Sequence, residues 1–221
     1  MGMLSLADNE LTTLDLSKTP AIESLNLQNN HLTSLNVHGL TSISTLNVKL
    51  NQLATLDLSG LNTLRTLIVS DNPALTSLEV STLTSLSSIR ADNCALEQIA
   101  LPASITEFYA KGNKLTTLGE ETLSLAKLKR LRVPNNQIAQ VTLGECPLLN
   151  DLELDGNQLT SLTLGSLPAL RTFTYRAISS MPRRSIRSIQ PSRHPKVLSK
   201  SLAMLVLRQL LATSLSIKAG R

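Results

Sequence analysis

The 221-residue chain is long enough for one or two domains, and 42% of its residues are hydrophobic. Aromatic residues make up only 2% and tryptophan is absent, which excludes an aromatic core and leaves leucine to fill the interior. The formal net charge of +5 averages two unlike regions, because residues 1–175 carry eleven basic and sixteen acidic side chains whereas residues 176–221 carry ten basic and no acidic ones.

One phrase, L-x-L-x-x-N-x-L, returns along the first four-fifths of the chain. Residues Leu46–Leu53 spell it in full, and other copies begin at Leu25, Leu131 and Leu152. A period near 21 residues predicts a solenoid of stacked coils, one coil per repeat. The steps between successive asparagine positions are 21, 21, 21, 22, 19, 23 and 21 residues, and these positions are Asn9, Asn30, Asn51, Asn72, Cys94, Asn113, Asn136 and Asn157.

Each copy predicts a short strand followed by a sharp turn. Because side chains alternate along a strand, Leu25 and Leu27 point to one face and Asn26 to the other. A single strand cannot bury its apolar face, so the copies are expected to stack into a parallel sheet. The amide of Asn51 should then pair with backbone groups of the turn, which cost about 1–3 kcal/mol each when buried without a partner. The same register places Asn47 on the solvent side.

The segments that return from one strand to the next alternate apolar and polar residues. Examples are Leu11–Ser17, Leu32–Val37 and Leu53–Gly60, which contain β-branched residues and show no helical period. They predict short extended pieces and turns. The segment Leu118–Leu128 is longer than the others, and we expect one helical turn within it.

The spelling L-T-x-L-D-L-S in these return segments, at a step near 21, resembles the repeats of internalin-type bacterial surface proteins of the leucine-rich-repeat family. The resemblance covers residues 3–175 as about eight to nine repeats. It implies a leucine-rich-repeat solenoid (α/β class, mostly β). The parallel β-sheet would lie on the concave face, with turns, short extended segments and few or no long helices on the convex face.

A separate basic tail is predicted at residues 176–221, because Ile178 stands where the next asparagine is due. We expect it to be disordered or a short helix, and a sequence read out of frame explains its composition best. No nucleic-acid partner is expected, since aromatic residues do not interleave its basic ones. A membrane span over residues 197–217 is disfavoured, because Lys200 or Arg208 at a helix centre costs about 2.5–3.5 kcal/mol.

Motifs for catalysis, metal binding or phosphate binding are missing from the sequence. His31, His38 and His194 have no metal-ligand grouping, and Cys94 and Cys146 lie two repeats apart, too far for a disulfide. The expectation is therefore a protein that is not an enzyme and needs no cofactor or metal.

The outer face of the predicted sheet is the candidate site, because the resemblance makes it the usual ligand surface. Its first strands carry small side chains, whereas the fifth to eighth strands are crowded with charge around Tyr109. One interpretation is a solvated ladder of salt bridges, in which Arg132 compensates the neighbouring Glu153. The other is a protein-recognition patch with Tyr109 at its centre. Its residues are Arg90, Glu107, Tyr109, Lys111, Arg130, Arg132, Asp151 and Glu153.

The sequence thus predicts a module that binds a protein ligand of unknown identity. The resemblance implies a fragment of a bacterial surface or secreted adhesin, although the chain shows no signal peptide and opens in mid-repeat. The unit Leu101–Ile105, which begins Leu-Pro, resembles repeats of secreted effectors and leaves open the recognition half of an effector enzyme. A nonfunctional gene remnant is the third alternative.

Overall fold

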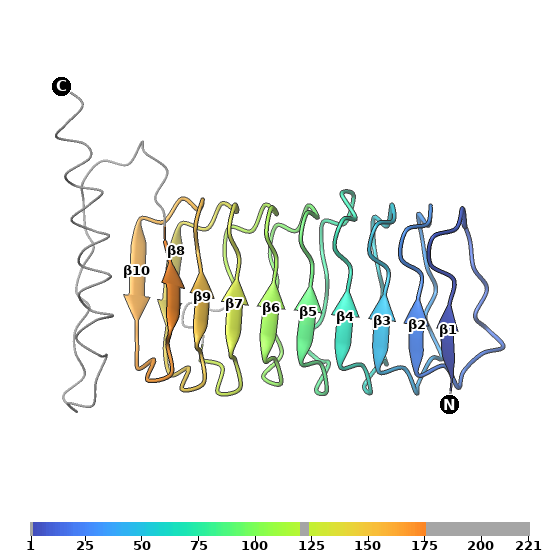
Figure 1. Cartoon of the computed structure of the whole chain (residues 1–221), viewed down its shortest axis with the longest axis horizontal. Coiled ribbons are helices and arrows are strands. Elements are labelled where there is room, and N and C mark those ends of the chain that lie inside the picture. Colours follow the sequence, from blue (N-terminus) through green and yellow to red (C-terminus); the bar gives the residue numbers. More distant parts are fainter. Residues whose placement is uncertain (1, 120–123, 176–221) are drawn as a thin grey trace, which may run out of the picture.

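The computed structural model describes residues 2–119 and 124–175, which form short strands joined by turns. In this part of the chain, nine strands form the main sheet, in the order β1-β2-β3-β4-β5-β6-β7-β9-β11, and β8 with β10 forms a small sheet. Figure 1 shows the labelled strands of the main sheet side by side along the long axis of the molecule. The strands are β1 Met3–Ser5, β2 Ser24–Asn26, β3 Thr45–Asn47, β4 Thr66–Ile68, β5 Ser88–Arg90, β6 Glu107–Tyr109, β7 Arg130–Arg132, β8 Gln140–Leu143, β9 Asp151–Glu153, β10 Ser161–Leu164 and β11 Thr172–Thr174.

The strands of the main sheet are parallel and aligned repeat by repeat. Leu25 lies beside Leu46, and Leu46 lies beside Leu67. These middle residues point inward and are fully buried, as is Phe108, which replaces leucine in β6. Burying one such side chain contributes about 1.5–3 kcal/mol. The leucine-rich-repeat solenoid predicted from the sequence is therefore confirmed.

The return side of the solenoid contains turns and extended backbone, as the alternating segments predict. Its only strand pair in the described residues is β8 with β10, which run parallel with Gln140 beside Ser161. Residues 2–119 and 124–175 contain no helix, and therefore no helix that could span a membrane. The helical turn expected within Leu118–Leu128 falls largely on residues 120–123, outside the described residues. The predicted tail, with its membrane-span and nucleic-acid alternatives, also lies outside them.

Asn51 shows how the repeated asparagine joins neighbouring coils. Its Nδ2 donates to the carbonyl of Val48 in its own coil (3.1 Å) and to that of Leu27 in the preceding coil (2.9 Å). Its Oδ1 accepts the N–H of Leu32 at 3.0 Å. Asn51 is buried, and these bonds satisfy three backbone groups of the turns that no strand pairing reaches.

The same contacts recur along the asparagine ladder, the name used here for the eight positions from Asn9 to Asn157. At six of these positions the asparagine Nδ2 donates to a carbonyl of the preceding coil, three residues before that coil's own ladder position. The Oδ1 accepts an N–H of the preceding coil, two residues after that ladder position. The steps vary from 19 to 23 residues while these contacts do not. Changes in repeat length are therefore absorbed elsewhere in the coil. The residues that follow this rule are Asn30, Asn51, Asn72, Asn113, Asn136 and Asn157.

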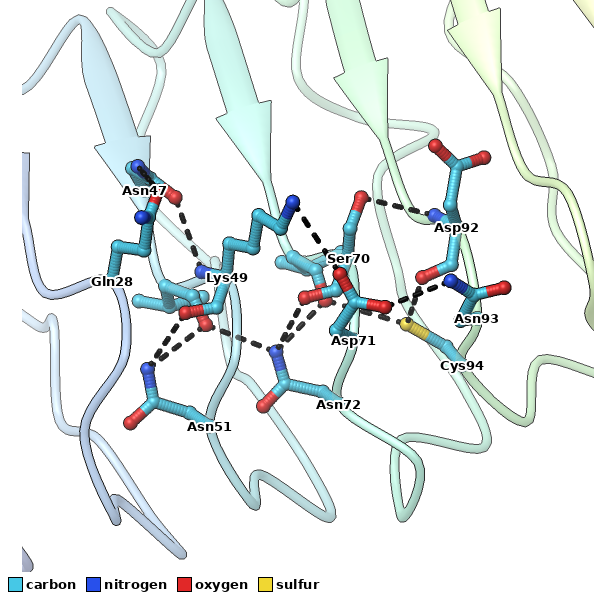
Figure 2. Close-up of polar contacts among 12 residues, drawn as sticks. Gln28, Asn47, Lys49, Asn51, Ser70, Asp71, Asn72, Asp92, Asn93 and Cys94 are labelled. Atoms are coloured by element: carbon cyan, nitrogen blue, oxygen red, sulfur yellow. Dashed lines mark hydrogen bonds and ion pairs between the residues drawn. The ribbon is translucent and has the colours of Figure 1, made fainter.

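Cys94 interrupts the ladder, yet the backbone N–H of Leu75 still has a partner. The Sγ of Cys94 donates to the carbonyl of Val69 at 3.3 Å, as Figure 2 shows beside Asn51 and Asn72. Burial raises the pKa of the Cys94 thiol to about 11, so the S–H proton is retained at neutral pH. A thiol cannot replace the amide oxygen as a strong acceptor. This repeat, however, has one extra residue at Pro73, and the turn it forms lets the N–H of Leu75 bond to the carbonyl of Asn72 at 3.0 Å.

The residue before each ladder position adopts a left-handed backbone conformation. This column holds aspartate, asparagine or glycine in all cases but one, as at Asn29 (φ 56°) and Gly156 (φ 69°). Leu50 is the exception, with φ 56° and a side chain left 42% exposed. A left-handed conformation costs an ordinary L-residue about 1–2 kcal/mol, less for asparagine or aspartate. The backbone at Leu50 is therefore strained, and burial of its exposed side chain offsets little of that cost.

We predict that Asn51→Ala lowers the free energy of unfolding by about 1–3 kcal/mol for each backbone group left buried without a partner. The matched control is Gln52→Ala, because Gln52 is the next residue and is exposed. It should change the free energy by less than about 0.5 kcal/mol. Urea unfolding followed by circular dichroism measures both, and equal effects would contradict the ladder.

Cys94→Ala should cost less than Asn51→Ala, because it removes a weak S–H···O bond and the N–H of Leu75 keeps its local partner. Parallel urea titrations of the two variants check this. A cost at Cys94 equal to or above that at Asn51 would show that the extra residue at Pro73 does not replace the missing amide oxygen.

Leu50→Asn is expected to raise the free energy of unfolding by about 1 kcal/mol, since asparagine tolerates the left-handed conformation. Thermal unfolding of the variant beside the parent protein measures the change. A lower melting temperature would mean that contacts of the Leu50 side chain outweigh the backbone strain.

Candidate functional site

The main sheet aligns the predicted site residues in two rows on its outer face. One row runs through Arg90, Tyr109, Arg132 and Glu153, which are successive register partners on β5, β6, β7 and β9. The second row is Glu107, Arg130 and Asp151. Lys111 follows β6 by two residues, and its N–H bonds to the carboxylate of Asp92 at 2.7 Å. The structure therefore brings seven of the eight predicted residues onto adjacent strands and places Lys111 just after one of them.

Tyr109 lies at the centre of this group. The guanidinium carbon of Arg90 is 4.8 Å from the centroid of its ring, and that of Arg132 is 5.9 Å away. Both distances fall within the range of cation–π attraction, worth about 0.5–1 kcal/mol at exposed sites. The Tyr109 hydroxyl donates to Glu107 at 3.3 Å. Tyr109 is half-buried and its strand is anchored by the buried Phe108, so the ring is held in a defined position.

One of the two closest ion pairs on this face, Arg132 with Asp151, is diagonal to the strand register, which the sequence does not predict. Arg130 pairs with Glu107 on β6, and Asp151, its other register partner, is left to Arg132. The Nε of Arg132 lies 2.9 Å from Asp151 but 3.8 Å from Glu153. The expected compensation of Arg132 by Glu153 is thus the weaker contact. Exposed pairs of this kind contribute about 0–1 kcal/mol.

The arginines are more exposed than the carboxylates that they pair with. The side chain of Arg130 is 44% exposed and that of Glu107 24%. Arg132 is also 44% exposed, whereas Asp151 is 11% and Glu153 34% exposed. The pKa of both guanidinium groups is raised, chiefly by a hydrogen bond that Arg130 donates to Tyr109 and by one that Arg132 donates to Asp151. The outermost charge over β7 is therefore a permanent positive one.

Arg90 is the site arginine whose charge is not neutralised by a neighbour. It is exposed, and among the described residues its guanidinium has no carboxylate within ion-pair distance. Its contact is with the Tyr109 ring, which holds the planar group in place without using its N–H donors. Arg90 is thus ordered and still able to bind an acceptor.

The opposite end of the face carries a row of amides that sequence reasoning missed. Asn47 donates to the amide oxygen of Asn26 at 3.0 Å and to that of Gln28 at 3.4 Å, and its own Oδ1 accepts the N–H of Lys49 at 3.1 Å. Figure 2 shows Asn47 near Gln28 and Lys49. Asn47 lies on the outer face as expected, but it is half-buried and hydrogen-bonded there. The sequence feature that could have predicted this row is the recurrence of asparagine at Asn26 and Asn47, which occupy the same position in successive repeats.

The remaining candidate groups form no reactive cluster. His38 pairs with Asp57 at 3.1 Å, and Gln52 lies 3.5 Å from His31. Cys94 and Cys146 are both buried and are not joined by a disulfide. Within residues 2–119 and 124–175, histidine, cysteine, aspartate and glutamate do not gather into a group that could hold a metal ion. His194 lies outside the described residues.

Comparison with known proteins finds likeness in structure rather than in sequence. No family model matches the chain, and no curated protein matches it significantly. The functional domain of InlJ from Listeria monocytogenes, which includes a cysteine ladder, is 24% identical, with a TM-score of 0.64 over 76% of this chain and 40% of that one. A leucine-rich-repeat protein of Leptospira interrogans is 23% identical, with a TM-score of 0.55 over 78% of this chain and 56% of that one. The chain thus spans less than two thirds of either structure, and identities this low establish a shared fold alone.

Proposed function

We propose that the chain is a protein-binding leucine-rich-repeat module whose ligand binds the main-sheet face over β5, β6, β7 and β9. The observation that carries the proposal is the placement of Tyr109, half-exposed and in contact with Arg90 and Arg132. Tyrosine and arginine are the residue types that dominate binding hot spots, together with tryptophan. The chain contains only two tyrosines and two phenylalanines, so an aromatic side chain on the solvent face is a rare feature of it.

The rigidity of the face supports this proposal. Association costs about 0.5–1.5 kcal/mol for each mobile side chain that it immobilises. Tyr109, Arg130 and Arg132 already hold one another and their carboxylates through the contacts described above. A ligand that binds here loses little further entropy from the protein side.

The wider role of the module follows from resemblance. The internalin-type spelling of the repeats, together with the fold shared with the InlJ domain, supports a part of a bacterial surface or secreted adhesin. On this proposal the chain recognises another protein and has no catalytic task.

The alternative is that the charged face is only a solvated ladder of ion pairs. Its exposed pairs would then contribute little stability, and substitutions there would leave every interaction of the protein unchanged. A binding measurement with variants on both ends of the face separates the two interpretations.

We predict that Tyr109→Ala weakens binding of a partner recovered by affinity capture by about 2 kcal/mol or more, as expected of an anchor residue. Tyr109→Phe should retain most of the affinity, since it keeps the ring that Arg90 and Arg132 contact. Titration calorimetry with the purified partner measures both variants.

Ser24→Ala on β2 is the control at the plain end of the face, and it should leave the affinity unchanged. Arg132→Glu should slow association in a salt-dependent way, because it reverses a charge that steers the partner. Loss of binding in Ser24→Ala with full binding in Tyr109→Ala would move the site away from β6.

A further inference from the structure

The layering of charge over β5, β6 and β7 indicates what kind of partner fits the site. Glu107 and Asp151 are the carboxylates that pair with Arg130 and Arg132, and both are less exposed than those arginines. A partner that approaches the face meets guanidinium groups first. Positively charged side chains of a partner would be repelled before they reached the shielded carboxylates.

The guanidinium groups also keep unused hydrogen-bond donors. Each guanidinium has five N–H donors. Arg130 bonds Glu107 through Nη1 and also donates to Tyr109, and Arg132 bonds Asp151 through Nε and Nη2. Arg90 makes no side-chain hydrogen bond among the described residues, and the Tyr109 ring fixes its position. A planar guanidinium with free donors matches the two oxygens of a carboxylate.

The nearby acidic groups limit where such a ligand can lie. Glu153 is 34% exposed and sits beside Arg132 on the β9 side. Asp92 follows β5 and accepts the N–H of Lys111. A carboxylate ligand is therefore favoured between these two groups, over Arg90, Tyr109 and Arg130.

We propose that the site recognises an acidic segment of its protein partner, with Arg90 as the residue that determines specificity. Carboxylates of the partner pair with Arg90 and with the free N–H groups of Arg130 and Arg132, while contact with the Tyr109 ring holds Arg90 and Arg132 in place. This inference rests on the proposed function of the same face and adds the chemical class of its ligand.

The test uses the full chain and a synthetic octaglutamate peptide, with octalysine and a neutral glycine–serine octapeptide as comparisons. Tyr109 and Tyr175 are the only two tyrosines, so tyrosine-labelled protein gives two sets of ring signals by nuclear magnetic resonance. Tyr109→Phe assigns them. We expect octaglutamate alone to shift the Tyr109 signals saturably, and added salt to weaken the effect.

Arg90→Gln should raise the apparent dissociation constant at Tyr109 about tenfold, the loss expected for one charge-assisted hydrogen-bonded pair. Arg90→Lys keeps the charge without the planar group and should fall between. Arg65→Gln is the matched control, because it removes the same charge from an exposed arginine just before β4. It should leave the Tyr109 titration unchanged.

Residues 176–221 carry ten basic side chains and can attract octaglutamate by themselves. Tyr175 is next to them in sequence, so shifts confined to Tyr175 would show binding to that segment only and would overturn the inference. Equal effects of Arg90→Gln and Arg65→Gln would overturn it as well. In either case the proposed function would stand if a captured partner still depended on Tyr109, and it would fail separately if none did.

Discussion

Hydrogen bonds from buried asparagine amides hold the turns of this solenoid together. Six ladder asparagines each donate to their own coil and to the preceding one and accept an N–H from the preceding coil, as Asn51 does with Val48, Leu27 and Leu32. Without these bonds, the inward turn would bury backbone groups that no strand pairing satisfies. The leucine core could form only at that cost, so the amide is the constraint on which the stacking depends.

The candidate site follows from this stacking. Because each ladder contact fixes a coil against its predecessor, the strands align in register, and residues about 20 positions apart become neighbours. Tyr109 meets Arg90 and Arg132 in this way, although they come from three different repeats. The repeat lengths of 19 and 23 residues on either side of Asn113 do not disturb the alignment, because the extra or missing residues fall outside the ladder contacts.

The sequence predicts the fold well because its signal is periodic. The spacing of the asparagines predicts the solenoid, the leucines that point inward, and the strand position that each site residue occupies. It does not predict side-chain pairing, since Arg132 can reach either Asp151 or Glu153 and the choice depends on where Arg130 turns. It likewise misses the half-buried Asn47 and the left-handed Leu50, because their conformations depend on contacts between coils and on a backbone angle that residue types alone do not fix.

Amide hydrogen exchange tests the ladder most directly, because it reads the backbone groups that the asparagines are said to satisfy. In the parent protein the N–H of Leu32, which Asn51 accepts, should exchange as slowly as those of the buried strands. In Asn51→Ala its exchange should accelerate, while the N–H of Leu115, bonded to Asn136 four coils further along, stays protected. An unchanged rate at Leu32 in this variant would contradict the account, since it would show that the amide is not what holds neighbouring turns together.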